Sequence, residues 1–562
     1  MHLNNSKADN GQDIVELFAS NFSAIYSQES LAPPEFNYLK TLQTPLYNLT
    51  ITEDETLKLL LKSKLDSSSG PDGIPPIVLK KCARAIVQPL VILFNRLLVS
   101  GTYPQTWKIS YIIPIFKGGR DRSNIAQYRP ICKISAIPKL FEHIIYTKLT
   151  PILSPLIISN QHGFIKNKST TSNLVSFIEC VNESVEAGHQ FDCCATDYSK
   201  GFDKVNINIL CAKLEAYGLA DPLLSWFRNF LTNRRQVVKL RKARNDDIYL
   251  SQPFEVLSGC PQGGHLSGLL FNLYINDVHQ VIVPLFWLYA DDKRIGTVIK
   301  TPEDHLVLQN ALDRLYEWCE INRMVLNIEK CKIISFTKKK STSTFNYTIN
   351  DTTVPRENKV KDLGVILESD LSLNQHYEAI KNKALRALGF INRNTKNFKN
   401  PNTYKILYFT LVRPILEYAS PVWSPHNKVH IKTIEKTQRK FLKSLAYKQG
   451  KCIINHDYNE ILQHNKMETL EKRRYKQDLA FLHKVLHNKI DSPDILSKIP
   501  IKAYPRQTRN RTYVFGEKKC RTNLGYFSPL NRILRSYNTE VASNPNIDIF
   551  HLPYHQFIKS IK

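Results

Sequence analysis

Two adjacent aspartates, Asp291 and Asp292, stand between two stretches whose composition favours β-strands. The apolar run 285–290 precedes them, and a second strand-like run, 295–299, follows. A hairpin turn would explain the pair, because aspartate is common in turns and its side chain can bond its own backbone. The other explanation is a metal site, in which the turn presents carboxylates to a divalent cation. Taken alone, the pair favours the turn.

A metal site of the two-ion kind needs a third carboxylate, since its ions lie about 3.5–4 Å apart among carboxylates from separate strands. Asp197 is the candidate, because residues 191–196 (FDCCAT) have the composition of a short buried strand and Asp197 ends it. A helix is expected next, with Ser199 as its cap and Asp203 in its first turn. The helix dipole explains Asp203, which we leave out of the metal site, and it is the simpler explanation for Asp197 as well.

The elements around these residues predict a mixed α+β architecture. Residues 1–68 show mainly helical periodicity, and the turn-rich SSSGPDGIPP follows. The helix expected at 78–99 should be interrupted at Pro89. Between about 107 and 370, β-prone runs (YIIPIF, FDCCATD, FWLYA, KIISF) mix with helical segments, and beyond about 375 the pattern is helical.

Length and composition exclude several classes of protein. A chain of 562 residues is too long to fold around one ordinary hydrophobic core, so two or three domains are expected. The eleven cysteines lack CxxC or Cys/His ligand spacing, which predicts neither a zinc module nor a disulfide framework. The polar start lacks the apolar core of a signal peptide, and no apolar run reaches the length of a membrane span. We therefore expect a soluble, intracellular protein.

Basic residues are concentrated in the last third of the chain. The net charge of the whole sequence is +27. Residues 1–380 contain 42 basic and 38 acidic side chains, whereas residues 381–562 contain 35 basic and 12 acidic ones. A lysine-rich solvated surface is the simpler explanation, but the uneven distribution favours a polyanionic partner such as nucleic acid.

Longer segments occur in a fixed order along roughly residues 50–540. They are GPDGIPPIVLK, WKISYIIPIFKGGRDRSNIAQYRPICKIS, QHGFIKNKSTTSNL, TDYSKGFDKVN, SGCPQGGHLSGLLFNLYIND, LYADD, VLNIEKCKIISF, KDLGVILESDLSLNQHY, LYFTLVRPILEYASPVWSP, EKTQRKFLK and YFSPLNRILRSYN. In this order they resemble the reverse transcriptases of non-LTR retrotransposons, most of all the jockey group. The first three resemble finger segments, the next five palm motifs, and the last three the C-terminal region.

The resemblance implies an α+β right-hand polymerase with fingers, a palm built on an antiparallel sheet, and a helical thumb. It divides the chain into an N-terminal helical extension (1–68), fingers and palm (69–370, core domain about 97–368), and a thumb with a basic, mainly helical C-terminal region (371–562). The implied activity is RNA-directed DNA polymerisation, which adds dNTPs to a primer 3′-hydroxyl.

The catalytic residues follow from the same resemblance. Asp197 and Asp291 match the two metal-binding carboxylates, and Asp292 matches the neighbouring acid. Two Mg²⁺ ions, or Mn²⁺, would activate the 3′-hydroxyl and neutralise the leaving pyrophosphate. The carboxyl groups of Asp197 and Asp291 should then lie within a few ångströms at one edge of an antiparallel sheet. Lys330 matches a lysine that protonates the pyrophosphate, with Lys332 on the same strand face as a rival.

Five positions match nucleotide-binding residues. Lys117 and Arg129 match finger residues that grip the triphosphate, although a solvated loop is the simpler explanation for Lys117. Phe202 matches the aromatic residue that excludes a ribose 2′-hydroxyl, and a core position on its helix would explain it too. Gln262 and Gly263 match the palm loop under template and nucleotide, but Pro-Gln-Gly-Gly also suits a tight turn.

Some positions depart from the family pattern. Gly201 replaces a common alanine, Gly264, Ser267 and Gly268 replace Ser, Gly and Pro, and Lys293-Arg294 replaces Thr-Lys. None removes a catalytic group, and together they suggest a divergent lineage or a drifting copy. The roughly 50 residues before the resembling region are too few for the endonuclease domain of such elements. We therefore expect that domain to be lacking.

Three interpretations remain. The first is an active polymerase that binds template RNA, a primer or target DNA, and dNTPs, with no membrane partner. The second is a catalytically inactive, nucleic-acid-binding relic. The third, an intron maturase or telomerase-like polymerase, shares the palm chemistry, but the downstream motifs argue against it. The expected location is the nucleus and cytoplasm, as a ribonucleoprotein.

Overall fold

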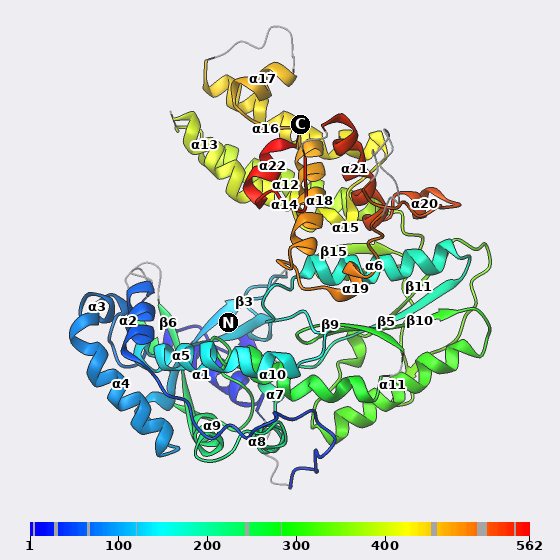
Figure 1. Ribbon diagram of the computed structural model, residues 1–562. Coiled ribbons are helices and arrows are strands. Elements are labelled where there is room, and N and C mark those ends of the chain that lie inside the picture. The colour runs from blue at the N-terminus through cyan, green and yellow to red at the C-terminus, as the bar shows by residue number, and fades with distance from the viewer. Residues whose placement is uncertain are drawn as a thin grey trace.

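The computed structural model describes residues 1–3, 6–26, 32–63, 68–119, 121–241, 247–282, 284–398, 400–450, 458–502, 514–544 and 547–561. Helices and sheets alternate in the first two thirds, and the remainder is helical, which confirms the α+β class. In Figure 1 the two larger sheets lie side by side in the lower body, and the helical C-terminal region stands above one of them.

The sheet expected of the palm is present. In the described part of the chain it is antiparallel, in the order β11 (Lys332–Phe336), β5 (Gln190–Thr196), β10 (Asp292–Ile299) and β9 (Leu285–Tyr289). Cys193 packs in a cluster with α6 (Thr170–Glu186), and Cys194 packs in another with α11 (Asp304–Ile321). Figure 1 shows these helices on opposite sides of the sheet. Burial on both faces explains why most of FDCCAT is apolar. Its one acid, Asp192, is also buried and accepts from the Tyr347 hydroxyl at 2.9 Å.

A second sheet lies where the fingers are expected. Its described strands are β4 (Tyr128–Lys133), β3 (Ile109–Phe116), β6 (Arg234–Arg241), β7 (Ile248–Leu250) and β8 (Phe254–Val256), with β3 and β6 parallel. Helix α1 (Gly11–Ser23) packs against this sheet through Val15, Phe18 and Phe22. The N-terminal helix is therefore joined to the finger sheet, and the domain boundary at 68 stays a prediction.

The expected break at Pro89 is wrong. The chain forms α3 (Pro76–Lys81) and α4 (Ala83–Val99), which separate at Cys82, and α4 continues through Pro89. Proline removes one backbone donor from a helix. Pro89 and Ala85, four residues earlier, are both exposed, so water can bond the carbonyl that the ring leaves free. The neighbouring helices are α2 (Glu53–Lys62), α5 (Ala136–Leu153) and α9 (Leu223–Leu231).

The helix expected after Asp197 also differs. Helix α7 (Gly201–Lys204) is a single turn, and its N-cap is Lys200 in a left-handed conformation, so Ser199 does not cap it. Helix α8 (Ile207–Ala216) starts separately at Asn206, whose side chain accepts from the Ile209 backbone. The continuous apolar pattern of this region concealed the break between the two helices.

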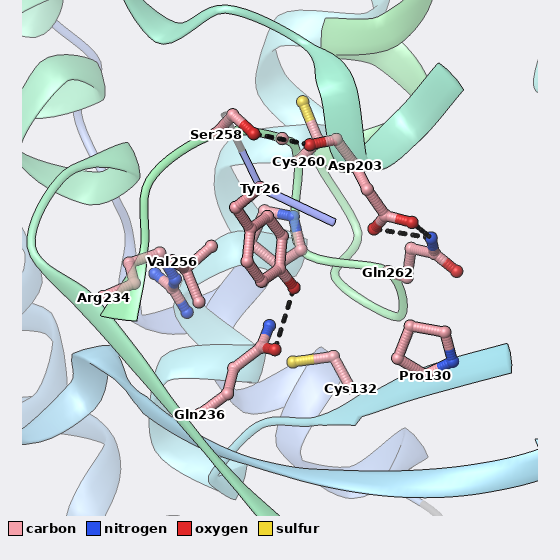
Figure 2. A pocket seen from close by; sticks show the side chains of 12 residues that line it. Tyr26, Pro130, Cys132, Asp203, Arg234, Gln236, Val256, Ser258, Cys260 and Gln262 are labelled. Carbon is pink, nitrogen blue, oxygen red and sulfur yellow. Dashed lines mark hydrogen bonds between the residues drawn. The ribbon is translucent and has the colours of Figure 1, made fainter. Parts of the chain in front are cut away.

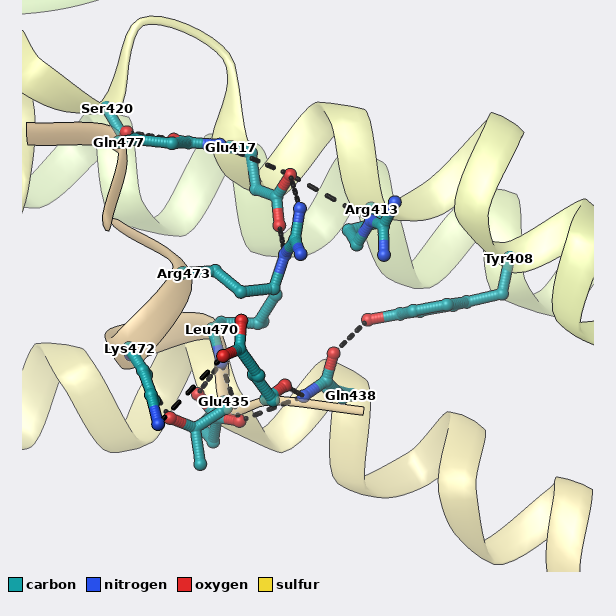
Figure 3. Close-up of polar contacts among 12 residues, drawn as sticks. Tyr408, Arg413, Glu417, Ser420, Glu435, Gln438, Leu470, Lys472, Arg473 and Gln477 are labelled. Atoms are coloured by element: carbon teal, nitrogen blue, oxygen red, sulfur yellow. Dashed lines mark hydrogen bonds and ion pairs between the residues drawn. The ribbon is translucent and has the colours of Figure 1, made fainter. Parts of the chain in front are cut away.

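The C-terminal region is held together by buried polar contacts. Glu417 forms an ion pair with Arg473, and Glu435 accepts from the Leu470 backbone at 3.1–3.2 Å (Figure 3). Its helices include α12 (Asn374–Asn394), α13 (Pro401–Leu407), α14 (Arg413–Glu417), α16 (Lys428–Lys448), α17 (Tyr458–His464), α18 (Leu470–Leu486) and α21 (Pro529–Ser543). Among the described helices, none has the length and apolar character needed to cross a membrane.

Acidic side chains of α6 fix this region to the palm. Glu183 pairs with Lys498 at 2.6 Å and Lys518 at 2.5 Å. Glu179 accepts from the Leu530 backbone at 2.6 Å. One hydrophobic cluster also joins α6 to the C-terminal helices. The palm and the C-terminal region therefore share a core, and the boundary at 370 stays a prediction.

Candidate active site

Three acidic residues lie at one end of the palm sheet. Asp197 directly follows β5, and Asp291 and Asp292 lie at the tip of the β9–β10 hairpin. Thr196 pairs with Lys293 across the two strands, which brings Asp197 beside that tip. The chain turns through Ala290, whose φ is +55°. The turn explanation of the aspartate pair therefore holds, and the strand register also places a third carboxylate beside the turn. The metal site itself stays a prediction.

The negative charges of these residues act on one another. Burial, and then the charge of Asp197, raises the pKa of Asp291. Burial, followed by the charges of Asp291 and Asp197, raises the pKa of Asp292 to about 6. Lys330 Nζ lies 2.9 Å from Asp197 Oδ2. The hairpin tip therefore holds concentrated negative charge, which a proton or a metal cation would relieve.

Whether the residues fit a divalent ion can be judged from their donors. Within the described ranges, no three or more His, Cys, Asp or Glu side chains gather closely enough to hold a metal. Mg²⁺, however, is usually bound by one or two protein carboxylates, with substrate phosphates and water as the other ligands. Asp197 and Asp291 supply two such carboxylates, and oxygen donors suit hard cations. The residues therefore fit an ion completed by substrate.

Positive side chains lie near the carboxylates. Burial, and then the charges of Arg129 and Lys330, lowers the pKa of Lys117, so these cations lie close together. The charge of Arg129 also lowers the pKa of Asp291, although the effect of burial, which raises it, is larger. Lys332 is engaged elsewhere, since its Nζ lies 2.7 Å from Glu357 Oε1. Of the two rival lysines, the one that contacts a site aspartate is Lys330.

A cleft of about 380 Å³ lies between Phe202 and the palm loop. Phe202, Gln262 and Gly263 line it, together with Tyr146, Phe164, Gly264, His265, Ser267, Gly268 and Leu269. Phe202 stacks on Phe271 with ring centroids 4.1 Å apart, so it is both a packing residue and a wall of the cleft. Gly263 has a φ of +122°, and a Cβ there would lie 2.5 Å from the Cys132 carbonyl oxygen. The palm loop thus needs glycine to approach β4.

Asp203 has a role that the sequence did not reveal. Gln262 Nε2 donates to both of its carboxylate oxygens, at 2.7 and 2.8 Å (Figure 2). Tyr26 lines the same small cavity and donates to Gln236 at 2.9 Å. Burial raises the pKa of Asp203 to about 6. Asp203 is therefore more than a charge at a helix start, because it fixes the amide of a cleft residue.

The unusual Lys293-Arg294 pair is buried in the sheet. Arg294 forms an ion pair with Asp362 of β14 (Lys359–Asp362) at 2.9 Å. The ammonium group of Lys293 lies 2.9 Å from the centre of the Tyr198 ring. These side chains connect β10 to Asp362 and Tyr198. The sequence around them did not indicate that the two charges are buried.

Comparisons with known proteins give a consistent result. Residues 117–390 match the family model described as "Reverse transcriptase (RNA-dependent DNA polymerase)". The chain is 26% identical over 399 residues to the "Probable RNA-directed DNA polymerase from transposon X-element" of Drosophila melanogaster, covering 69% of this chain and 43% of that protein. It is 25% identical over 454 residues to the "RNA-directed DNA polymerase from mobile element jockey" of the same species, covering 77% and 48%.

A third relative is the "Probable RNA-directed DNA polymerase from transposon BS" of Drosophila melanogaster, 23% identical over 513 residues, covering 86% of this chain and 55% of that protein. The chain thus spans about half the length of the curated relatives that it matches.

Proposed function

We propose that this protein, whose residues 117–390 belong to the reverse transcriptase family, is an RNA-directed DNA polymerase that extends a primer 3′-hydroxyl with dNTPs. The observation that carries the proposal is the position of Asp197 beside Asp291 at one end of the palm sheet, with Lys330 and Arg129 near them. Separate strands that deliver carboxylates to one point, beside side chains suited to phosphates, form the arrangement that nucleotidyl transfer needs.

Each residue then has a task. Asp197 and Asp291 hold the ions, and Asp292 adds negative charge. Mg²⁺ held there would supply Lewis-acid chemistry at the 3′-hydroxyl and the triphosphate. Lys117 and Arg129 bind the triphosphate oxygens, for which charged donors are the strongest partners. Lys330 donates a proton to the pyrophosphate that leaves.

The cleft would receive the incoming nucleotide. Phe202 forms a wall against which the sugar packs, so a ribose 2′-hydroxyl would collide with its ring. Gln262 and Gly263 support the base pair from the palm loop. The stacking of Phe202 on Phe271 supports this task, because a ring held on one side cannot swing away from the sugar.

An exposed row of cations on α16 suits the template and primer. Lys428, Lys432, Lys436 and Lys440 recur every four residues and are exposed, so they share one face of the helix. The acid within α16, Glu435, is buried and bonded to the Leu470 backbone. Such a row fits the phosphates of template RNA and a DNA strand. The protein would then work in the nucleus and cytoplasm as a ribonucleoprotein.

Primer extension tests the proposal. Purified protein is given an RNA template with an annealed DNA primer, dNTPs and Mg²⁺ or Mn²⁺, beside Asp291→Asn and the control Asp313→Asn. Asp313 is an exposed residue of α11. We expect extension by the wild type and the control and loss of it in Asp291→Asn. Salt-sensitive binding of primer–template without any extension would instead identify an inactive nucleic-acid-binding relic.

A further inference from the structure

The turn that carries Asp291 has an unusual backbone. Ala290 has a φ of +55° and is 5% exposed. A left-handed conformation costs a residue with a Cβ about 1–2 kcal/mol, so it persists only where the surroundings impose it. Asp291 follows directly, and its carboxylate direction therefore depends on how Ala290 is held.

The side chain of Gln161 holds that residue. Its Oε1 accepts from the Ala290 N–H at 2.9 Å, and its Nε2 lies 3.5 Å from the Ala290 carbonyl oxygen. The same Oε1 accepts from the Gly163 N–H at 2.7 Å, which fixes the amide. Gln161 is 1% exposed, so water cannot replace these bonds. One amide thus serves both backbone groups of the strained residue.

The segment around Gln161 is itself fixed to the hairpin. The Leu288 N–H donates to the Asn160 carbonyl at 3.1 Å, and the His162 N–H donates to the Leu288 carbonyl at 3.0 Å. A Cβ at Gly163 would lie 2.3 Å from the Ala290 nitrogen, so glycine permits the close approach. Residues 160–163 therefore follow β9 to its end and place Gln161 against the turn.

We propose that Gln161 is a positioning residue, which sets the direction of the Asp291 carboxylate by holding Ala290 in its left-handed conformation. The inference rests on the proposed polymerase function of the same site. Gln161 touches neither substrate nor metal in this account. It acts through the backbone of Ala290, 129 positions later in the chain.

The chain offers a matched control at the other end of the same sheet. Gln190 is 2% exposed and begins β5, whereas Asp197 follows its end. Its amide also serves one residue's backbone, because Nε2 donates to the Ser343 carbonyl at 2.8 Å and Oε1 accepts from the Ser343 N–H at 3.0 Å. Methionine at either position keeps the length of the side chain and removes the bonds.

The experiment compares Gln161→Met, Gln190→Met and the double variant Gln161→Met/Ala290→Gly. We expect Gln161→Met to lower kcat about 10- to 100-fold, as small misplacements of reacting groups do, and to weaken Mn²⁺ binding measured by electron paramagnetic resonance. Gln190→Met should change neither. Ala290→Gly should restore part of both losses, because glycine adopts positive φ without support. If Gln161 only stabilised the fold, adding Ala290→Gly to Gln161→Met would restore neither kcat nor Mn²⁺ affinity.

The outcomes separate the two proposals. Extension by the wild type with unchanged kcat and Mn²⁺ affinity in Gln161→Met would overturn the positioning role alone. If the wild type fails to extend primers, the polymerase proposal falls, and Mn²⁺ affinity across the same variants still decides the role of Gln161. Should Gln161→Met not fold, Gln161→Glu keeps the acceptor oxygen and loses the donor. Because the kept oxygen makes the 2.9 Å bond to Ala290, that variant should retain its Mn²⁺ affinity. A loss of affinity that Ala290→Gly does not restore would also overturn the inference.

Discussion

Gln262 Nε2 donates to both carboxylate oxygens of Asp203, which lies 59 positions earlier in the chain. The amide is therefore fixed at the wall of the cleft. Hydrogen bonds to a charged group contribute about 1.5–3 kcal/mol, so their loss frees the glutamine. We expect Asp203→Ala to raise the KM for dNTPs about tenfold or more, with a smaller effect on kcat. Asp203→Asn keeps one acceptor oxygen. Its KM for dNTPs should lie between those of the wild type and Asp203→Ala.

Steady-state extension kinetics measure this effect. The pKa of Asp203, which burial raises to about 6, adds a second signature. Below that pH the carboxyl is protonated and offers fewer acceptors, so the KM of the wild type should rise as the pH falls from 7 to 5. The KM of Asp203→Ala should lack this rise. An unchanged KM in Asp203→Ala at pH 7 would show that Gln262 does not depend on Asp203.

Glu142 should make the stability of the fold depend on pH. It is fully buried on α5, with Oε2 bonded to the His265 backbone at 3.2 Å and Oε1 without a hydrogen-bond partner among the described residues. Burial raises its pKa to about 7 from 4.5. Between pH 4.5 and about 7, Glu142 is therefore protonated in the folded protein and ionised in the unfolded protein. Stability must then fall as the pH rises through this window.

Glu142→Gln removes the proton exchange and keeps the shape. Since one pKa unit corresponds to about 1.36 kcal/mol, the variant should be about 1–3 kcal/mol more stable than the wild type at pH 8, and the difference should vanish near pH 5. Urea unfolding at the two pH values measures it. Exposed Glu317 provides the control substitution Glu317→Gln. Parallel stability curves for Glu142→Gln and the wild type would contradict the assignment.

The sequence predicted the elements whose pattern is local. FDCCAT became β5, and the two runs flanking Asp291 and Asp292 became β9 and β10, because a short run of apolar and β-branched residues identifies a buried strand. The α+β class needed no more than the order of such segments.

What the sequence could not provide depends on contacts between distant residues. Asp203 was interpreted from its own helix, yet its partner is Gln262, and no periodicity links the two positions. Gln161 received no role from the sequence, because the strained backbone that it serves lies 129 positions away. The uninterrupted α4 illustrates the opposite error, since a local rule about Pro89 was outweighed by the packing of the helix.

The two rival lysines can be separated by substitution. Lys330 Nζ lies 2.9 Å from Asp197 Oδ2, whereas Lys332 Nζ is paired with Glu357 at 2.7 Å. If Lys330 protonates the leaving pyrophosphate, Lys330→Gln should lower the single-turnover rate at saturating dNTP about 10²-fold, the usual contribution of a general acid. Lys332→Gln should leave that rate within about twofold. Equal losses in both variants would mean that the two lysines contribute through charge alone.

The row of cations on α16 should make nucleic-acid binding depend on salt. Each lysine that neutralises a phosphate of a duplex contributes about 0.9 to the slope of log affinity against log salt concentration. We therefore expect the triple variant Lys432→Glu/Lys436→Glu/Lys440→Glu to bind primer–template more weakly and to reduce that slope by about 2–3. Fluorescence anisotropy across a salt series measures both quantities.

A matched control makes the test specific to α16. Lys338, Lys339 and Lys340 are exposed and follow β11, and reversing their charges changes the net charge by the same amount. If binding depends on contact with α16, this control should lower affinity through its long-range field and leave the salt slope nearly unchanged. Equal reductions of the slope in the two triple variants would mean that the basic region attracts nucleic acid without a defined surface, and α16 would lose its assigned role.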